Sequence, residues 1–433
     1  MFSIRFIVLV LVSMLLTAGC ATNPATGRSQ LSLMSMSTEK EIEIGKSMFP
    51  QVLQKMGGTY PDKELATYVQ RVGERLKSAS YRSGLNFTFK VVNDSTPNAF
   101  AMPGGYIAIT RGLLTHLENE AQLAAVLGHE IGHVDARHAV QGMQRSSLLN
   151  IGLAVLSGAT GTSQYSGLIN TSGEIAATLV DRSYSRDQEE ESDRLGIDYM
   201  AKTGYDPNGA VELQQIFFRK IEGGKEAGWL EGMFRTHPFS RKRMEQNQEY
   251  IAANYGRTPS RSKSSNSEFL LITKRLRDSR AGYALYEQAR VAEKKEDDKK
   301  AIALYLQAAA AAPDEALILS HLGIAYLRAG DLVSARRHLQ HAARLDSEYF
   351  QTQLGLSYMY LNEGDAGRTI QHARKSFNLL PTLEGAYLLA RGFDANGETE
   401  KALEYYRAVE KTDPRSKMGK HAAARIVVLE GNK

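Results

Sequence analysis

The sequence predicts a mainly α-helical protein in which a mixed α+β domain is followed by an array of helical repeats. Two strand-like patterns, "NFTFKVVND" (86–94) and "GGYIAIT" (104–110), lie between helical patterns in the first half of the chain. The last third repeats a helical motif at a spacing of 33 or 34 residues. With 433 residues, the chain is long enough for two or three domains, each with its own core.

The first twenty residues are typical of an export signal. After Arg5 comes an apolar run from Phe6 to Leu16, which suits a secretory signal but is shorter than the about 20 residues that span a bilayer. "LTAGC" ends at Cys20, the only cysteine, and resembles the bacterial lipoprotein signal, which is cleaved before the cysteine and acylated on its thiol. The alternative is an ordinary cleaved signal, but a lone free thiol is a liability in an oxidising compartment. We expect a lipoprotein signal peptide at 1–19 and lipidation of Cys20.

The same resemblance implies a location for the mature chain. Ala21, rather than an aspartate, follows Cys20. In lipoprotein sorting this favours a lipid-anchored protein on the outer membrane that faces the periplasm.

Four segments are expected after the signal. Residues 20–36 are small and polar and predict a tether, and residues 37–255 alternate helical and strand patterns. The Ser- and Arg-rich stretch "GRTPSRSKSSNSE" (256–268) predicts a linker over 256–280, before the repeats at 281–433.

Composition excludes little except nucleic acid as the main partner. Hydrophobic residues make up 42% and charged residues 23%, which is ordinary for a globular protein. The net charge of +5 is small for this length and there is no long basic block. We therefore expect no nucleic acid partner.

The repeats share a second helix that ends before a proline. The recurring segments are "AIALYLQAAAAAP" (301–313), "SARRHLQHAARLDS" (334–347), "TIQHARKSFNLLP" (369–381) and "ALEYYRAVEKTDP" (402–414). Ala301, Ala335 and Ala402 hold one repeat position, where only a small side chain fits between crossing helices, and Thr369 holds it in the third unit. This resembles the tetratricopeptide repeat, with four units and a capping helix at 417–431; an ordinary bundle is the alternative. The resemblance implies a curved solenoid surface that binds protein partners.

The stretch "GHEIGHVDARH" (128–138) lies in a helical pattern that we expect to run through "ENEAQLAAVLGHEIGHVDARHAV" (118–140). His129 and His133 are four residues apart, so both imidazoles project from one helix face and could bind one zinc ion. Glu130 lies beside them and could take a proton from the attacking water. A satisfied structural cluster is the alternative. His138 lies about 140° around the helix from His133 and is predicted not to be a ligand.

A further zinc ligand is expected from the acidic helical segment "SYSRDQEEESDRLG" (183–196). Glu189 and Asp193 share a helix face, so one carboxylate could bind the metal while Asp193 accepts a hydrogen bond from a ligand histidine. Glu190 and Glu191 are expected to be solvated. Spacing alone does not choose among the three glutamates.

The motifs His129-Glu130-x-x-His133 and Ser185-Arg186-x-x-Glu189-x-x-x-Asp193 are similar to those of the HtpX, Oma and CAAX-prenyl-protease type of zinc endopeptidases. The resemblance implies a zincin-like metalloprotease fold and one Zn²⁺ per chain. It makes Glu189 the third ligand, and it gives Glu130 and Asp193 catalytic roles. In that family an exposed strand edge pairs with the substrate backbone. The matching residues here are Gly105, Tyr106, Ile107, Ala108, Ile109 and Thr110.

A signal in front and repeats behind most resemble the periplasmic BepA type of this family. The resemblance implies an endopeptidase that degrades misfolded or stalled outer-membrane proteins and binds partners, including outer-membrane assembly machinery, through its repeats. The lipoprotein signal departs from that soluble type, which leaves the location open. The alternative is a chaperone or adaptor with a latched or inactive zinc site.

Two segments suggest how access to the site is controlled. In "MFRTHPFSRKR" (233–243) the resemblance implies His237 as an autoinhibitory fourth ligand, and Arg241 or Arg243 as an oxyanion stabiliser. The apolar and then Gly/Ser/Thr-rich residues 146–173 predict a flexible lid, with a surface membrane contact as the alternative.

Overall fold

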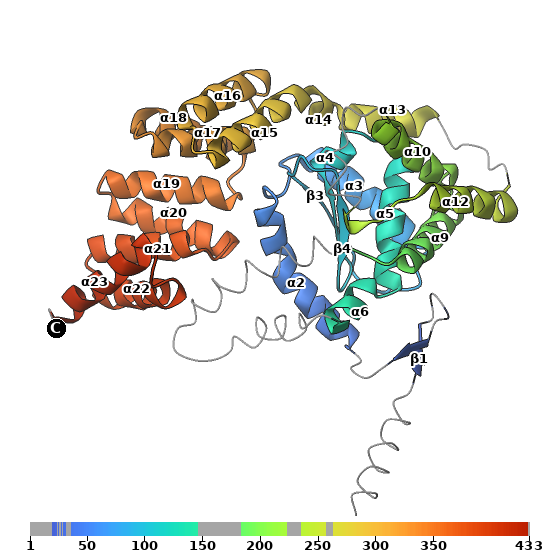
Figure 1. The fold of residues 1–433 in the computed structure, drawn as a ribbon, viewed down its shortest axis with the longest axis horizontal. Coiled ribbons are helices and arrows are strands. Elements are labelled where there is room, and N and C mark those ends of the chain that lie inside the picture. Colours follow the sequence, from blue (N-terminus) through green and yellow to red (C-terminus); the bar gives the residue numbers. More distant parts are fainter. Residues whose placement is uncertain are drawn as a thin grey trace, which may run out of the picture.

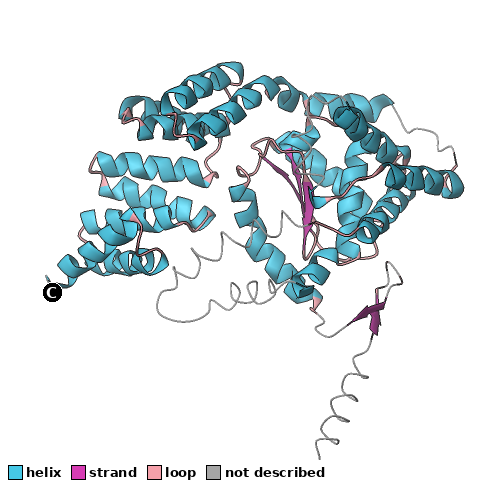
Figure 2. Ribbon diagram, in the orientation of Figure 1, coloured by secondary structure: helices cyan, strands magenta, loops and turns pink. Residues whose placement is uncertain are grey.

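A computed structural model describes residues 20–23, 25, 27, 29–31, 36–145, 183–222, 235–256 and 263–431. It contains a small sheet surrounded by helices, followed by a helical solenoid that leads to the C-terminus (Figures 1 and 2). The expected signal peptide and the expected lid at 146–173 lie outside the described residues. Within the expected tether, β1 (Cys20–Thr22) pairs antiparallel with β2 (Ser29–Leu31). None of the described helices has the length and apolarity needed to cross a membrane.

The central sheet has the strand order β3-β5-β4. β3 (Thr88–Val92) runs parallel to β5 (Tyr106–Thr110), and β4 (Ala99–Met102) runs antiparallel to it. Because β5 is the middle strand, both of its edges are paired. The prediction that Gly105–Thr110 forms an exposed edge is therefore wrong, and the outer strands are β3 and β4.

Helices surround the sheet (Figure 1), and two apolar clusters pack against its strands. They are α2 (Thr38–Lys55), α3 (Lys63–Lys77), α4 (Arg111–Leu114), α5 (Glu120–Asp135), α6 (His138–Arg145), α9 (Arg186–Lys202), α10 (Asn208–Glu222) and α12 (Arg241–Asn254). Leu65 of α3, Ile107 of β5 and Leu127 of α5 are fully buried together. This core fixes α5, which carries the His-Glu-x-x-His motif, against the sheet.

The helix expected to continue to Val140 is interrupted between α5 and α6. Arg137 has φ of 59°, in the left-handed region that side chains other than glycine rarely adopt. Its guanidinium donates to the Met36 carbonyl and pairs with Glu41, and these contacts hold the strained conformation. The prediction of one continuous helix is wrong at this point, and the break turns His138 back toward His133.

The expected linker is largely helical. α13 (Lys263–Ile272) and α14 (Lys274–Asp278) occupy most of it. Phe269 and Leu276 are fully buried in the core of the first domain. The Ser- and Arg-rich composition did not indicate these apolar anchors, and the linker over 256–280 stays a prediction. The domain boundaries themselves remain predictions.

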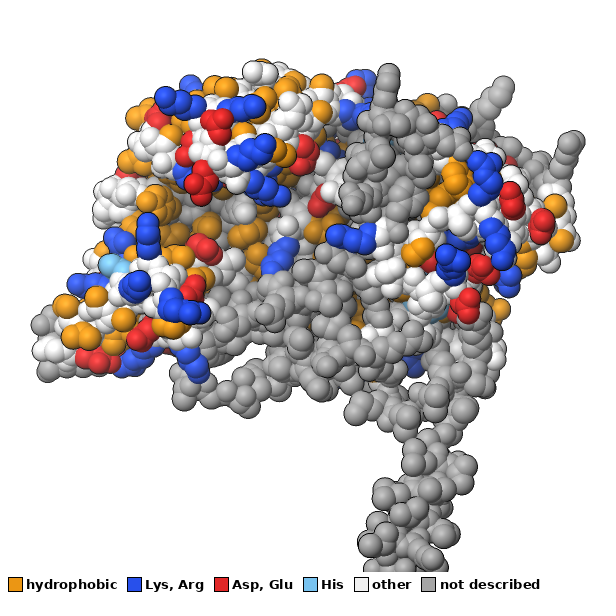
Figure 3. All heavy atoms as spheres, viewed as in Figure 1, with side chains coloured by type: hydrophobic (Ala, Val, Ile, Leu, Met, Phe, Trp, Pro, Cys, Tyr) orange, Lys and Arg blue, Asp and Glu red, His pale blue; other side chains and the backbone are white. Residues whose placement is uncertain are grey.

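The solenoid has four helix pairs and a capping helix, as predicted. The pairs are α15 (Arg280–Lys294) with α16 (Asp298–Ala311), α17 (Ala316–Arg328) with α18 (Leu332–Leu345), α19 (Phe350–Asn362) with α20 (Ala366–Leu379), and α21 (Leu383–Ala395) with α22 (Thr399–Thr412), before α23 (Lys417–Gly431). The repeat position held by Ala301, Ala335, Thr369 and Ala402 is fully buried in every unit. Figure 3 shows charged side chains of both signs interspersed over the repeat helices on the face drawn.

A buried polar network joins the solenoid to the first domain. The Tyr283 hydroxyl lies 2.7 Å from a carboxylate oxygen of Glu315 and 3.0 Å from Asn93 Oδ1. The Arg111 guanidinium lies 3.2 Å from the centroid of the Tyr283 ring. Tyr60 donates to Glu315 over 2.9 Å. Because these groups are buried and paired, the first repeat is docked on the domain rather than tethered to it.

Candidate metal centre

The centre is built where α5 crosses α9 at backbone contact. A Cβ atom on Gly132 would lie 2.8 Å from the Ser192 carbonyl oxygen, and one on Gly196 would lie 2.8 Å from the His129 nitrogen. Ser185 caps α9 through a capping box with Gln188, so Glu189 falls in the first turn. These local features bring Glu189 next to the two histidines of α5.

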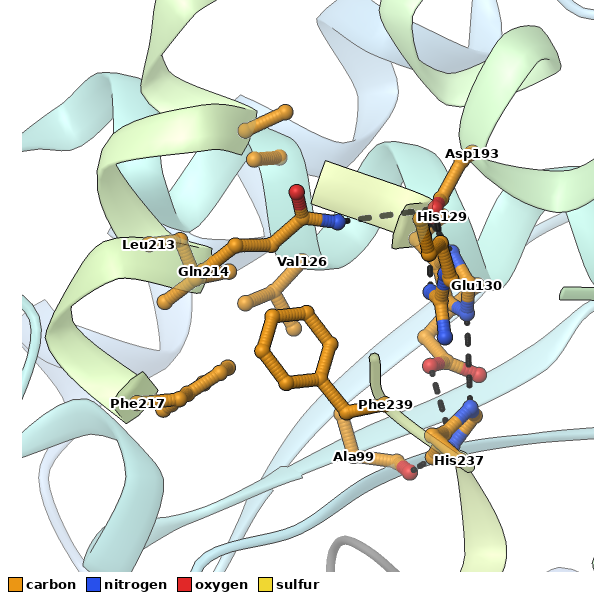
Figure 4. A pocket seen from close by; sticks show the side chains of 13 residues that line it. Ala99, Val126, His129, Glu130, Asp193, Leu213, Gln214, Phe217, His237 and Phe239 are labelled. Atoms are coloured by element: carbon orange, nitrogen blue, oxygen red, sulfur yellow. Dashed lines mark hydrogen bonds and ion pairs between the residues drawn. The ribbon is translucent and has the colours of Figure 1, made fainter. Parts of the chain in front are cut away.

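Four residues from three segments converge on one point. His129, His133, Glu189 and His237 each offer one ligand atom, and these atoms all lie within 4.8 Å of one another. The Nε2 atoms of His129 and His133 are 3.0 Å apart. Glu189 Oε1 lies 3.3 Å from His133 Nε2 and 2.9 Å from His237 Nδ1. Figure 4 shows His129 and Glu130 on one side of the site and His237 beside Ala99 on the other.

These residues fit a zinc ion. Imidazole nitrogens and one carboxylate are the donor set that zinc takes in catalytic sites. The facing nitrogens of His129 and His133 cannot satisfy each other when both carry lone pairs, so a cation resolves the contact. Glu130 is 1% exposed, and its Oε2 has no hydrogen-bond partner in the described part of the chain. A buried oxygen without a protein partner at this place fits a site that receives a further polar group.

Asp193 orients His129. Its Oδ1 lies 2.8 Å from His129 Nδ1, which is the contact expected from the sequence. Burial acts to raise the pKa of Asp193, but the Arg243 guanidinium outweighs burial and holds that pKa well below its usual value. An ionised Asp193 accepts the Nδ1 proton, so the lone pair of His129 lies on Nε2 and faces the cluster.

His138 orients His133 in the same manner. Its Nε2 lies 3.0 Å from the Glu191 carboxylate, and its Nδ1 lies 2.8 Å from Nδ1 of His133. Burial lowers the pKa of both histidines, so both are neutral. His138 therefore donates to Glu191 and accepts from His133, which leaves the Nε2 lone pair of His133 facing the cluster.

Glu191 of the acidic helix takes part in this arrangement. His138 lies outside the four-residue cluster. The expectation that Glu191 is simply solvated is wrong, because its side chain is 12% exposed and pairs with His138. Glu190 is half-buried.

The two candidate oxyanion arginines differ in position. Arg243 is buried and donates to both oxygens of Asp193, to Glu189 and to the Pro238 carbonyl. Its donors are therefore engaged in holding the two carboxylates, which contradicts an oxyanion role in this arrangement. Arg241 is exposed, and its guanidinium lies 5.3 Å from the Phe218 ring rather than in the cluster.

The segment around His237 covers the edge of β4. His237 Nε2 donates to the Ala99 carbonyl over 3.2 Å, and the Thr236 carbonyl accepts from the Tyr184 backbone. Burial acts to lower the pKa of His237, but the carboxylates of Glu189 and Glu130 outweigh it and raise the pKa to about 9. His237 thus occupies both the strand edge and the centre of the cluster.

The sequence did not indicate three features of this site. These are the positioning role of His138, the edge position of Ala99, and the ring of Tyr184, which stacks on His133 with centroids 3.9 Å apart. Tyr184 directly precedes the Ser185-Arg186 motif, but nothing in the local pattern shows where its ring points. Each feature depends on a contact between segments far apart in the chain.

A donor set of this kind on a His-Glu-x-x-His helix defines a zinc metallopeptidase domain. Residues 63–251 match the model of peptidase family M48. This match confirms the resemblance to zinc metallopeptidases that the motifs around His129 and Glu189 indicated.

Known proteins match about half of the chain. The beta-barrel assembly-enhancing protease of Escherichia coli (strain K12) is 29% identical over 235 residues, which cover 52% of this chain and 46% of that protein. The mitochondrial metalloendopeptidase OMA1 of Schizosaccharomyces pombe is 29% identical over 234 residues, 53% of this chain and 65% of that protein. The match thus spans less than two thirds of either relative. The solved structure of the TPR protein YrrB matches with a TM-score of 0.30 and 18% identity, over 48% of this chain and 97% of that one, and adds nothing to the fold described above.

Proposed function

We propose that the chain is a zinc-dependent endopeptidase of the bacterial cell envelope that degrades misfolded or stalled outer-membrane proteins. The observation that carries the peptidase activity is the convergence of His129, His133 and Glu189 beside the buried Glu130. The substrate class is supported by the name of the beta-barrel assembly-enhancing protease, with which the chain shares 29% identity. The lipoprotein-like signal ending at Cys20 supports a periplasmic, lipid-anchored location at the outer membrane.

His129, His133 and Glu189 would hold one zinc ion, which when bound polarises the scissile carbonyl and makes water more acidic. Glu130 takes a proton from the attacking water and later gives it to the leaving amine. Burial raises the pKa of Glu130, which brings its proton affinity closer to the pH at which it must both accept and release a proton. Asp193 and His138 keep the two ligand histidines in the required tautomers.

His237 acts as a latch in this proposal. It contacts Glu189 and also the Ala99 carbonyl, on the strand edge where a substrate backbone would pair. A polypeptide must displace His237 to reach both places. The solenoid, which is docked next to the domain, binds unfolded polypeptides or assembly machinery.

The test is cleavage of an unfolded protein by the full chain, compared with Glu130→Gln. We expect cleavage that a chelator stops and that falls at least about a hundredfold in Glu130→Gln, while zinc binding is retained. If the parent is silent, His237→Ala should cut. If neither zinc-loaded protein cleaves the substrate, the peptidase function is contradicted and the second candidate, a chaperone or adaptor, is favoured. The observation that supports this candidate is the position of His237 within the cluster.

A further inference from the structure

A cavity opens beside the metal centre, between α5, α10 and the segment that follows His237. Its volume is about 60 Å³. Away from the cluster its walls are apolar, with Val126 from α5, Leu213 and Phe217 from α10, and Phe239 (Figure 4). His129 and Glu130 lie at its inner end, so an occupant of this cavity is next to the reacting atoms.

We propose that this cavity, which we name the flanking pocket, receives the side chain of one residue adjacent to the scissile bond and selects aliphatic side chains of about leucine size. The proposal rests on the proposed peptidase function and adds a substrate class to it. The substrates are polypeptides with Leu, Ile, Met or Val at one fixed position beside the cut.

Size favours a medium side chain. A cavity needs about 10–15 Å³ of such volume for each water-sized group, so the flanking pocket accepts roughly four to six of them. A leucine, isoleucine or methionine side chain is of this size. Phenylalanine and tryptophan are larger and would force the walls apart, whereas alanine or glycine leaves the cavity unfilled.

The chemistry of the walls excludes charged side chains. Of the charged groups that line the flanking pocket, Asp193 and Arg243 are paired with each other, and Glu130 and His237 belong to the metal centre. A further charge would lose its hydration against the apolar walls without gaining a partner. An aliphatic side chain gains from the same burial.

Gln214 indicates that the occupant is a peptide. Its side-chain Nε2 donates to Asp193 over 3.5 Å, and its Oε1 is buried without a hydrogen-bond partner among the described residues. Gln214 is 6% exposed and lines the flanking pocket. An orphaned acceptor in a cavity wall is satisfied when the occupant brings a donor. Every peptide residue other than proline carries an N–H beside its side chain, and a hydrocarbon ligand does not.

Phe239 sets the width of the flanking pocket. Its ring lies 6.2 Å from that of Phe217 and 4.7 Å from that of Phe218, between centroids. It is half-buried, whereas Leu213 and Phe217 belong to the main core. Changes at Phe239 therefore alter the flanking pocket with the least effect on folding.

The experiment is cleavage of a mixed peptide library by the full zinc-loaded chain and, in parallel, by its His237→Ala form, with the cut sites read by mass spectrometry. We expect Leu, Ile, Met and Val to be enriched at one flanking position. Phe239→Ala should raise kcat/KM for Phe relative to Leu at that position about tenfold, and Phe239→Trp should shift preference toward Val and Ala. Opposite shifts in side-chain preference, caused by two substitutions of Phe239, cannot both result from misfolding.

Ile216→Ala is the matched control, because Ile216 is buried on the same helix but does not line the flanking pocket. It should leave the Phe-to-Leu ratio unchanged. The proposal for the flanking pocket alone would fail if cleavage depends on Glu130 but shows no enrichment at any position. It would also fail if Phe239→Ala leaves the Phe-to-Leu ratio of kcat/KM unchanged. If no peptide is cut in a Glu130-dependent manner, the proposed peptidase function fails as well.

Discussion

The Nδ1 atoms of His133 and His138 lie 2.8 Å apart, and only one of them can carry the proton between them. Since Glu191 accepts from the other nitrogen of His138, that proton belongs to His133. The metal-facing lone pair of His133 is therefore fixed by a residue outside the cluster.

Replacing His138 should weaken zinc binding without removing a ligand. We expect His138→Ala to lower the zinc affinity about 10- to 100-fold, because His133 is then free to rotate and to change tautomer. Competition with a chelating dye measures this directly. His341→Ala, at a half-buried histidine of the solenoid, is the control and should bind zinc as the parent does. Parent-like affinity in His138→Ala would contradict the orienting role.

Removing Arg243 should destabilise the metal-free domain. Arg243→Ala removes the guanidinium that pairs with the buried carboxylates of Asp193 and Glu189, at a cost of about 3–5 kcal/mol in the free energy of unfolding. Arg243→Lys should recover only part of this, because an ammonium cannot make the forked contact to Asp193. Denaturant unfolding reports both values.

Arg241→Ala is the matched control, since Arg241 is exposed on the same helix and should change stability little. An Arg243→Ala protein of full stability that loses only kcat would restore the oxyanion role.

Opening the His237 latch should increase proteolysis. We expect His237→Ala to raise the rate of cleavage of an unfolded protein about tenfold, which corresponds to roughly 1.4 kcal/mol of closure free energy. Arg235→Ala, an exposed position on the same segment, should leave the rate unchanged. The latch would be refuted by a rate that stays equal or falls in His237→Ala.

The solenoid should lose stability in mild acid because of His321. This residue is 3% exposed and accepts a hydrogen bond from Arg290 over 2.9 Å. Burial and the charge of Arg290 lower its pKa to about 3. Between that value and the ordinary pKa of about 6.5 the unfolded chain binds the extra proton, so stability is full above about pH 6.5 and falls as pH decreases.

The expected slope is up to about 1.4 kcal/mol per pH unit between roughly pH 4 and 6. Denaturant unfolding of the full chain, followed by its helical circular dichroism signal, measures this slope against His321→Gln. The variant should have a shallower slope over this range. Equal slopes in the two proteins would show that His321 is not the responsible group.

The sequence predicted those features that depend on local spacing. The i, i+4 placement of His129 and His133 and the solenoid follow from periodicities that each segment carries by itself. The choice of Glu189 among three neighbouring glutamates came instead from the family resemblance. The Asp193 contact with His129 could be expected because both residues lie on regular helices that approach each other.

The features that the sequence did not predict depend on contacts between distant segments. The strand order places β4, not β5, at the edge, and no residue in either strand signals this. The break at Arg137 results from contacts with Met36 and Glu41, about a hundred positions earlier in the chain. Since that break decides where His138 points, the role of His138 was hidden as well.

The backbone contact between α5 and α9 limits how much the distance between the zinc ligands on these helices can vary. Zinc sites accept ligand distances within about 0.2 Å of their ideal values. A methyl group at Gly132 or Gly196 would have to move the helices apart by more than that, since it would otherwise lie 2.8 Å from the opposite backbone. The two glycines thus allow direct contact between the two main chains. The distance between the ligands is therefore set by the backbone and does not depend on the packing of side chains.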